Sequence, residues 1–79
     1  MNEREIFDAI KRNVLDLVPE IDPNSISAGC TLSDLGLNSI DRADVVTLTM
    51  EQLGIAVPVH EFHRGDTIGT LAGTMRRFA

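Results

Sequence analysis

Apolar residues in this chain of 79 residues recur at intervals of three and four, not in alternation. Such spacing places them on one side of an α-helix, whereas a half-buried strand requires an alternating pattern. The chain contains no repeat, no low-complexity stretch and no linker. A chain of this length buries only about 60% of its unfolded surface, so its core must be economical. The sequence therefore predicts a small all-α fold with a single domain, residues 1–79.

Three segments carry the helical pattern. We expect the first helix from about Glu3 to Val18, because Pro19 cannot continue it. The second should run from Ser39 to Leu53 and end at Gly54, a residue type suited to the position after a helix. The last should run from about Thr67 to Phe78. Short connections after the second helix predict three main helices with a small additional element between the second and the last.

The first and last helices should each pack against the core through a stripe of apolar side chains. These are Ile6, Ile10, Val14 and Leu17 in the first helix, and Ile68, Leu71, Ala72, Met75 and Phe78 in the last. Either Asp66 or Thr67 should cap the last helix, and the small additional element should be a turn from about His60 to His63. The order is therefore long helix, long helix, short element, long helix.

A long connection, Glu20 to Asn38, separates the first two helices. We expect it to contain no helix or strand and to be anchored by Ile26, Leu32 and Leu35. Connections of this length in a small domain are uncommon and are often functional. The plausible function here is to position Ser39, which follows directly.

Ser39 occupies the start of the second helix. Asn38 is a favoured N-cap and Asp41 adds a carboxylate to the first turn, so the Ser39 hydroxyl should lie at the exposed, positive end of the helix. A phosphate ester at this hydroxyl would be stabilised by free backbone N–H groups. On spacing alone, the simpler interpretation is that Ser39 only helps to cap the helix.

Two segments give the chain a family resemblance. Thr31 to Ile40, with the sequence TLSDLGLNSI, and Ile55 to Pro58, with the sequence IAVP, resemble the acyl and peptidyl carrier proteins. The resemblance implies a four-helix carrier bundle with a short third helix and a long first loop. It also implies that a phosphopantetheinyl transferase esterifies Ser39 with 4′-phosphopantetheine from coenzyme A, and that this arm carries acyl thioesters. Family members usually have aspartate before the serine, so Asn38 keeps the cap and loses a charge.

The resemblance extends to a class of pathway. The segments from Asn38 to Asp44, Met50 to Glu51 and Val57 to Pro58 look most like discrete polyketide-synthase carriers, in particular the donor carriers of β-branching cassettes. Such a carrier holds acetyl or malonyl and presents acetyl to a 3-hydroxy-3-methylglutaryl synthase homologue. The implied partners also include an acyltransferase and ketosynthase-like enzymes. Peptidyl carriers and the D-alanyl carrier are the alternatives within the family.

One side of the second helix is a candidate docking face. Ile40, Asp44, Thr47 and Glu51 follow i, i+4, i+7, i+11 spacing, which forms one stripe that is apolar beside the serine and acidic further along. The resemblance implies that partner enzymes contact this part of a carrier. From periodicity alone, an ordinary solvated strip with one exposed isoleucine explains the same pattern.

Charge and composition argue against several other classes of function. The formal net charge of −5 disfavours nucleic acid and anionic membranes as partners. No apolar run is long enough for a membrane span or a signal peptide, so we expect a cytoplasmic protein. We also expect the carrier to be a monomer. His60 and His63 are too few for a metal site, and we assign the single cysteine, Cys30, no role.

A catalytic role is also disfavoured. The nucleophile motif G-x-S-x-G is absent around Ser39, and 79 residues leave no room for a substrate pocket beside a core. We therefore expect a non-catalytic protein on which partner enzymes act. Outside the carrier family, the alternative is an unmodified helical module that binds a partner helix, with Ser39 only a cap.

Overall fold

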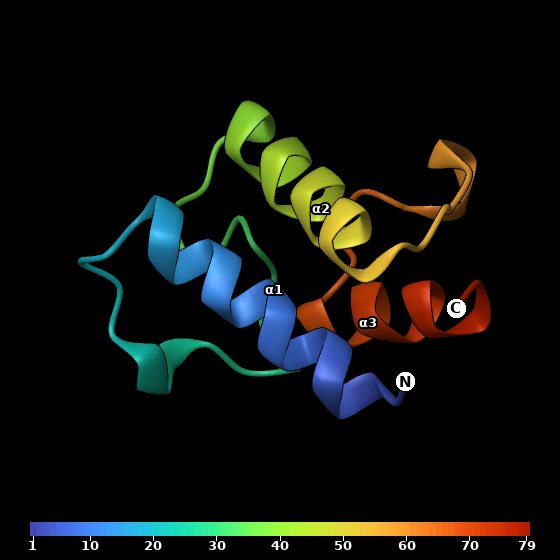
Figure 1. The fold of residues 1–79 in the computed structure, drawn as a ribbon. Helices are drawn as coiled ribbons and strands as arrows, with labels where there is room; N and C mark the ends of the chain where they lie inside the picture. The colour runs from blue at the N-terminus through green and yellow to red at the C-terminus, as the bar shows by residue number, and fades with distance from the viewer.

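The computed structural model, which describes residues 1–79 throughout, contains three α-helices: α1 (Glu3–Leu17), α2 (Ser39–Leu53) and α3 (Ile68–Arg77) (Figure 1). Helix α1 packs against both α2 and α3 and is the central element. The only β pairing is one isolated bridge, between Thr31 and Thr67. The all-α prediction is confirmed. None of the helices is both long enough and apolar enough to cross a membrane.

Helix α1 begins with a capping box. The Asn2 side chain accepts a hydrogen bond from the Glu5 backbone N–H at 2.9 Å, and the Glu5 carboxylate accepts one from the Asn2 N–H at 3.2 Å. Ile6, Ile10 and Val14 are fully buried, as predicted. The prediction for Leu17 is wrong, because its side chain is 43% exposed. Leu17 lies in the last turn, where Val18 and Ile21 of the following chain pack against the core instead.

Helix α3 follows its predicted stripe except at its end. Ile68, Leu71, Ala72 and Met75 are buried, whereas Phe78 is 38% exposed. The helix ends at Arg77, so Phe78 lies beyond the last helical residue, with the Arg77 guanidinium 5.9 Å from its ring centroid. Of the two candidate caps, the structure selects Thr67, whose hydroxyl accepts a hydrogen bond from the Thr70 N–H at 3.1 Å.

A single apolar cluster joins the three helices to the connections between them. Its buried members are Ile6, Ile10, Val14, Ile26, Leu32, Leu37, Val45, Ile55, Val57, Ile68, Leu71, Ala72 and Met75. Helix α2 contributes only Val45 to this cluster. Most of its remaining surface therefore faces the solvent or a neighbouring segment, which leaves α2 available for contacts outside the core.

A buried polar contact joins α1 to α2, and the sequence pattern did not indicate it. The Asn13 side-chain amide donates to the Thr49 hydroxyl at 2.8 Å and to the Gln52 side-chain oxygen at 3.0 Å. Thr49 is fully buried and its hydroxyl donates to the Val45 carbonyl at 2.7 Å. A buried polar contact of this kind is stable only in one register of the two helices, because any other register leaves these groups unpaired.

The long connection between α1 and α2 is more structured than predicted. It contains a 3₁₀-helix, η1 (Pro23–Ser25), which is capped by Asp22, so the expectation of no helix in this connection is wrong. Proline at the first position is pre-organised for such a turn. Ile26 and Leu32 are buried and Leu35 is half-buried, which confirms the predicted anchors.

Two backbone hydrogen bonds attach this connection to the start of α3. The Ile68 N–H donates to the Cys30 carbonyl at 2.8 Å, and the Gly69 N–H donates to the Ala28 carbonyl at 2.9 Å. These bonds satisfy two of the N–H groups that a helix start leaves free. The segment that leads to Ser39 is therefore fixed to the body of the protein.

The predicted short element between α2 and α3 is a 3₁₀-helix, η2 (Val59–Glu61). It starts one residue earlier than expected and spans three residues. In place of the short third helix of the predicted four-helix carrier bundle, the structure therefore has the 3₁₀-helix η2. In Figure 1 the segment that carries η2 projects beside α2 before the chain returns to α3.

Candidate functional site

The chain turns tightly just before α2. The Gly36 N–H donates to the Ser33 carbonyl at 2.9 Å, and the Leu37 N–H donates to the Leu32 carbonyl at 3.3 Å. Gly36 has a φ of 88°, a conformation that residues with a Cβ rarely adopt. Leu32 and Leu37, at the two ends of the turn, are both buried. The turn therefore holds the next two residues at a fixed place on the surface.

Asn38 and Ser39 form the start of α2 as the sequence predicted. The Asn38 side-chain oxygen accepts a hydrogen bond from the Asp41 N–H at 2.8 Å, and Ser39 is the first helical residue. Ser39 is exposed. The backbone N–H groups of Ser39 and Ile40 form no hydrogen bond within the protein. An exposed hydroxyl thus lies beside two free donors at the positive end of a helix, which is a favourable environment for a phosphate ester.

Arg42 connects the start of α2 to the preceding turn, and the sequence pattern gave no sign of this. Its guanidinium Nη1 donates to the Ser33 hydroxyl at 2.9 Å and to the Leu37 carbonyl at 3.1 Å. These bonds join α2 to both sides of the turn at Gly36. Arg42 therefore helps to fix the position of Ser39 relative to the loop.

The four residues of the candidate docking face, Ile40, Asp44, Thr47 and Glu51, are all exposed. Ile40 is 71% exposed, which is unusual for a large apolar side chain next to a core of this size. Neither Asp44 nor Glu51 forms an ion pair within the protein. The structure therefore confirms one solvent-facing stripe, and its role in docking stays a prediction.

The remaining candidates show no site of their own. No group of three or more His, Cys, Asp or Glu side chains is placed to hold a metal ion. His60 and His63 are both exposed. Cys30 is partly buried, and its thiol donates to the Ser27 carbonyl at 3.2 Å.

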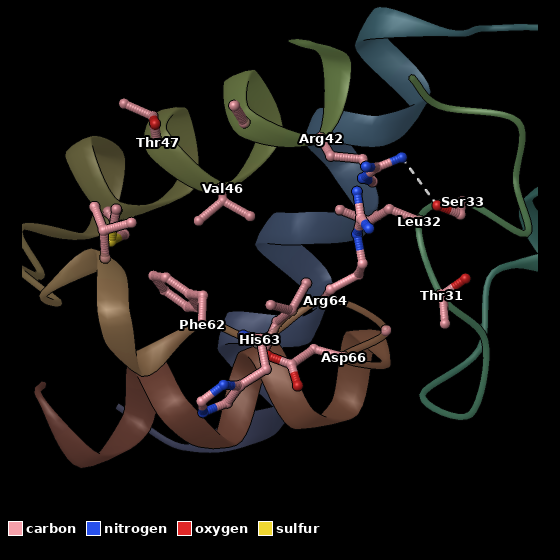
Figure 2. Close-up of a pocket in the computed structure, with 15 residues that line it drawn as sticks. Thr31, Leu32, Ser33, Arg42, Val46, Thr47, Phe62, His63, Arg64 and Asp66 are labelled. Carbon is pink, nitrogen blue, oxygen red and sulfur yellow. Dashed lines mark hydrogen bonds between the residues drawn. The ribbon is translucent and has the colours of Figure 1, made fainter. Parts of the chain in front are cut away.

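The structure contains a cleft that the sequence did not predict. It has a volume of about 680 Å³ and lies between α2 and the segment that follows η2. Its walls carry, among others, Arg42, Val46, Phe62 and Arg64 (Figure 2). The expectation that so short a chain leaves no room for a pocket is wrong, because α2 packs on α1 while the η2 segment passes beside α2 without closing against it.

Comparisons with known proteins agree with this geometry. The family model "Phosphopantetheine attachment site" matches residues 9–75. The chain is 32% identical to the polyketide biosynthesis acyl-carrier-protein AcpK of Bacillus subtilis (strain 168) over 91% of this chain and 88% of that protein. It is 29% identical to the mitochondrial acyl carrier protein of Dictyostelium discoideum over 95% of this chain and 59% of that protein.

A solved structure shares the fold. This is a chain in the crystal structure of the curacin biosynthetic pathway HMG synthase in complex with acetyl donor-ACP, with a TM-score of 0.82 and 27% identity over 94% of this chain and 95% of that chain. The family model spans most of the molecule, from the second turn of α1 to the end of the α3 stripe. The protein therefore belongs to the phosphopantetheine-attachment family, as an acyl carrier protein with a covalent 4′-phosphopantetheine group.

Proposed function

We propose that the protein is a non-catalytic carrier of polyketide biosynthesis and that Ser39 is its attachment residue. The observation that carries this assignment is the exposed Ser39 hydroxyl at the first position of α2, beside the free N–H groups of Ser39 and Ile40. The bound arm supplies a terminal thiol that holds an acyl group as a thioester. The residues of the chain itself position the point of attachment and present it to enzymes.

Each neighbour of Ser39 has a definite part in this proposal. Asn38 occupies only the Asp41 N–H, so the two donors nearest the hydroxyl stay free for the phosphate. Arg42 and the turn at Gly36 keep the helix start fixed on the body of the protein. Because Asn38 is neutral, the attachment site presents one negative charge fewer to a transferase than the usual aspartate does.

Within this class, we assign the protein to β-branching as an acetyl donor. The support is the likeness of the whole chain to a partner of an HMG synthase, together with 32% identity to a polyketide carrier. In this role Ser39 carries acetyl or malonyl, and a 3-hydroxy-3-methylglutaryl synthase homologue receives the acetyl group. A phosphopantetheinyl transferase, an acyltransferase and a ketosynthase-like enzyme complete the set of proposed partners. We propose that this cycle takes place in the cytoplasm with a monomeric carrier.

The docking face of Ile40, Asp44, Thr47 and Glu51 is the surface that we propose these enzymes contact. It begins one residue after Ser39, so an enzyme that reaches the arm meets it first. The unpaired carboxylates of Asp44 and Glu51 suit a basic enzyme surface. A small, charge-guided contact also suits a carrier that must leave each enzyme quickly.

Acetyl transfer tests the donor role. The protein is loaded at Ser39 with radiolabelled acetyl, then incubated with a 3-hydroxy-3-methylglutaryl synthase homologue and a second carrier that holds an acetoacetyl thioester. We expect the label to move to the synthase and then to the second carrier. A loaded protein that keeps its label, while a known donor carrier loses it in the same mixture, would contradict the donor role. Efficient loading with an amino acid by an adenylating enzyme would instead favour the peptidyl or D-alanyl alternatives.

A further inference from the structure

The cleft beside α2 lies on the same side of the helix as Ser39. Arg42, Ala43, Val46 and Met50 line it, and they follow Ser39 by three, four, seven and eleven residues. Residues at these intervals share one face of a helix. Ser39 therefore stands at the end of the stripe that forms one wall of the cleft, and a group tethered to Ser39 lies close to the cleft opening.

The charge inside the cleft is opposite to that of the molecule. The chain has a formal net charge of −5, yet two of its seven basic residues, Arg42 and Arg64, line the cleft, with only Asp66 from its twelve acidic residues. Neither arginine forms an ion pair. Figure 2 shows both side chains directed toward the end of the cleft where Ser33 lies. Two unpaired cations in one cleft repel each other, and a bound anion reduces this repulsion.

Both guanidinium groups have N–H donors that form no hydrogen bond within the protein. Arg42 uses Nη1 for Ser33 and Leu37, which leaves Nη2 and Nε without a partner in the protein. The Arg64 side chain forms no hydrogen bond, and the nearby Asp66 carboxylate accepts one from the His63 backbone N–H at 2.8 Å. Apolar side chains form part of the remaining wall, among them Val46, Met50, Phe62 and Leu71, beside polar residues such as Thr47 and His63. The cleft thus combines an apolar surface with planar cationic donors, which match a carboxylate well.

We propose that this cleft binds an acyl group that ends in a free carboxylate, such as malonyl, when that group is carried on the arm at Ser39. The inference rests on the proposed function of Ser39. The carboxylate meets Arg64 and Arg42, and the rest of the acyl group and the arm contact the apolar walls. Acetyl has no carboxylate and gains no ion pair, so the cleft distinguishes the two acyl groups that we assign to this carrier.

The test removes one guanidinium and varies the acyl group. Arg64→Gln is suitable because the Arg64 side chain is exposed and forms no hydrogen bond or ion pair, whereas Arg42 holds the loop. Arg12→Gln, at an exposed position of α1 away from the cleft, is the matched control. Ser39 of each protein is loaded with malonyl or acetoacetyl from the coenzyme A thioester. Acetoacetyl has the shape of malonyl without its charge. A small thiol is then added in excess, and the rate at which it takes the acyl group by thioester exchange is measured, because a thiol attacks both thioesters at the same carbonyl.

We expect Arg64→Gln to speed cleavage of the malonyl thioester about two- to fivefold, which corresponds to the loss of an exposed ion pair. Arg64→Gln should not change the cleavage rate of the acetoacetyl thioester, and Arg12→Gln should cleave both thioesters at the wild-type rate. At about 1 M salt the difference between Arg64→Gln and the wild type should disappear for malonyl as well. Equal acceleration of both thioesters, or none for malonyl, would overturn the inference. A wild-type protein that takes up no arm fails at the loading step and overturns the proposed function itself.

The NMR chemical shifts of the backbone amides identify which anion the cleft holds. Relative to the protein with an unacylated arm, malonyl should shift the signals of Val46, Phe62 and Asp66, and acetoacetyl should shift them much less. If attachment of the unacylated arm to the apo protein shifts the Arg42 and Arg64 signals and malonyl adds nothing, the bound anion is the phosphate of the arm. That result would overturn the assignment to a carboxylate.

Discussion

Individual side chains at the start of α2 fix the position of Ser39, the proposed attachment residue. Asn38 caps the helix, Ser39 stays exposed, and Arg42 ties the helix to the turn at Gly36. The cap could be predicted because it depends on residues within one turn of each other. The Arg42 contacts could not, since the Ser33 hydroxyl lies nine residues away and meets Arg42 only after the loop has folded back.

At the buried contact between α1 and α2, Thr49→Val should destabilise the protein by about 1–3 kcal/mol. The change keeps the side-chain shape but removes a hydroxyl that pairs with Asn13 and Val45, and it leaves one N–H of the buried Asn13 amide without a partner. Urea unfolding of the two single variants and of Asn13→Leu combined with Thr49→Val measures the effect. The double variant should lose less than the sum of the single losses, because both partners are then apolar. Strictly additive losses would show that the hydrogen bond contributes nothing.

On the proposed docking face, Ile40→Ala and Glu51→Lys should slow acyl transfer and leave folding stability almost unchanged. Both side chains are exposed, so the change in unfolding free energy should stay below about 0.5 kcal/mol. Glu51→Lys should reduce the transfer rate about two- to fivefold at low salt and less at high salt. Glu20→Lys, which reverses an exposed charge outside the stripe, is the control. Unchanged rates in both variants would place the enzyme contact elsewhere on the surface.

The local sequence pattern predicted some elements of the fold better than others. The three α-helices follow from apolar spacing and caps, and their ranges agree with prediction to within one residue. Leu17 and Phe78 were predicted to be buried and are exposed, because periodicity gives the side of a helix and not whether a partner covers its end. In the long connection, η1 was missed although Pro23 marks its first position.

Two glycines of α3 give a matched test of how closely the long connection packs on that helix. A Cβ at Gly69 would lie 3.0 Å from the Ala28 carbonyl oxygen, whereas a Cβ at Gly73 would meet only Glu3 at 3.5 Å. Gly73→Ala should therefore stabilise the protein by about 0.4–1 kcal/mol through reduced flexibility of the unfolded chain. Gly69→Ala should destabilise it, because the loop backbone must move and the Gly69–Ala28 hydrogen bond weakens. Thermal unfolding distinguishes the two, and a gain in both variants would mean that the connection is not held against α3.

The whole molecule is a small carrier in which α1 forms the centre and α2 is left largely free. Its all-α class and the place of Ser39 could be predicted from 79 residues, because both depend on local patterns and on the Thr31 to Ile40 segment. The cleft could not, since it forms where α2 and the η2 segment fail to meet, and no pattern within either segment reports on the distance between them. The Asn13–Thr49 contact could not be predicted for the same reason, because it joins residues that are 36 positions apart in the sequence.

The mass of the intact protein tests the central claim most directly. The wild-type protein and Ser39→Ala are each incubated with coenzyme A and a promiscuous phosphopantetheinyl transferase. The mass of each intact protein is then measured by mass spectrometry. The wild type should gain the mass of one arm and Ser39→Ala should gain none, although Ser25, Ser27 and Ser33 remain exposed in the loop. Fragmentation should place the arm on Ser39. A modified Ser39→Ala protein, or a wild type that stays unmodified while a known carrier in the same mixture is converted, would contradict the account.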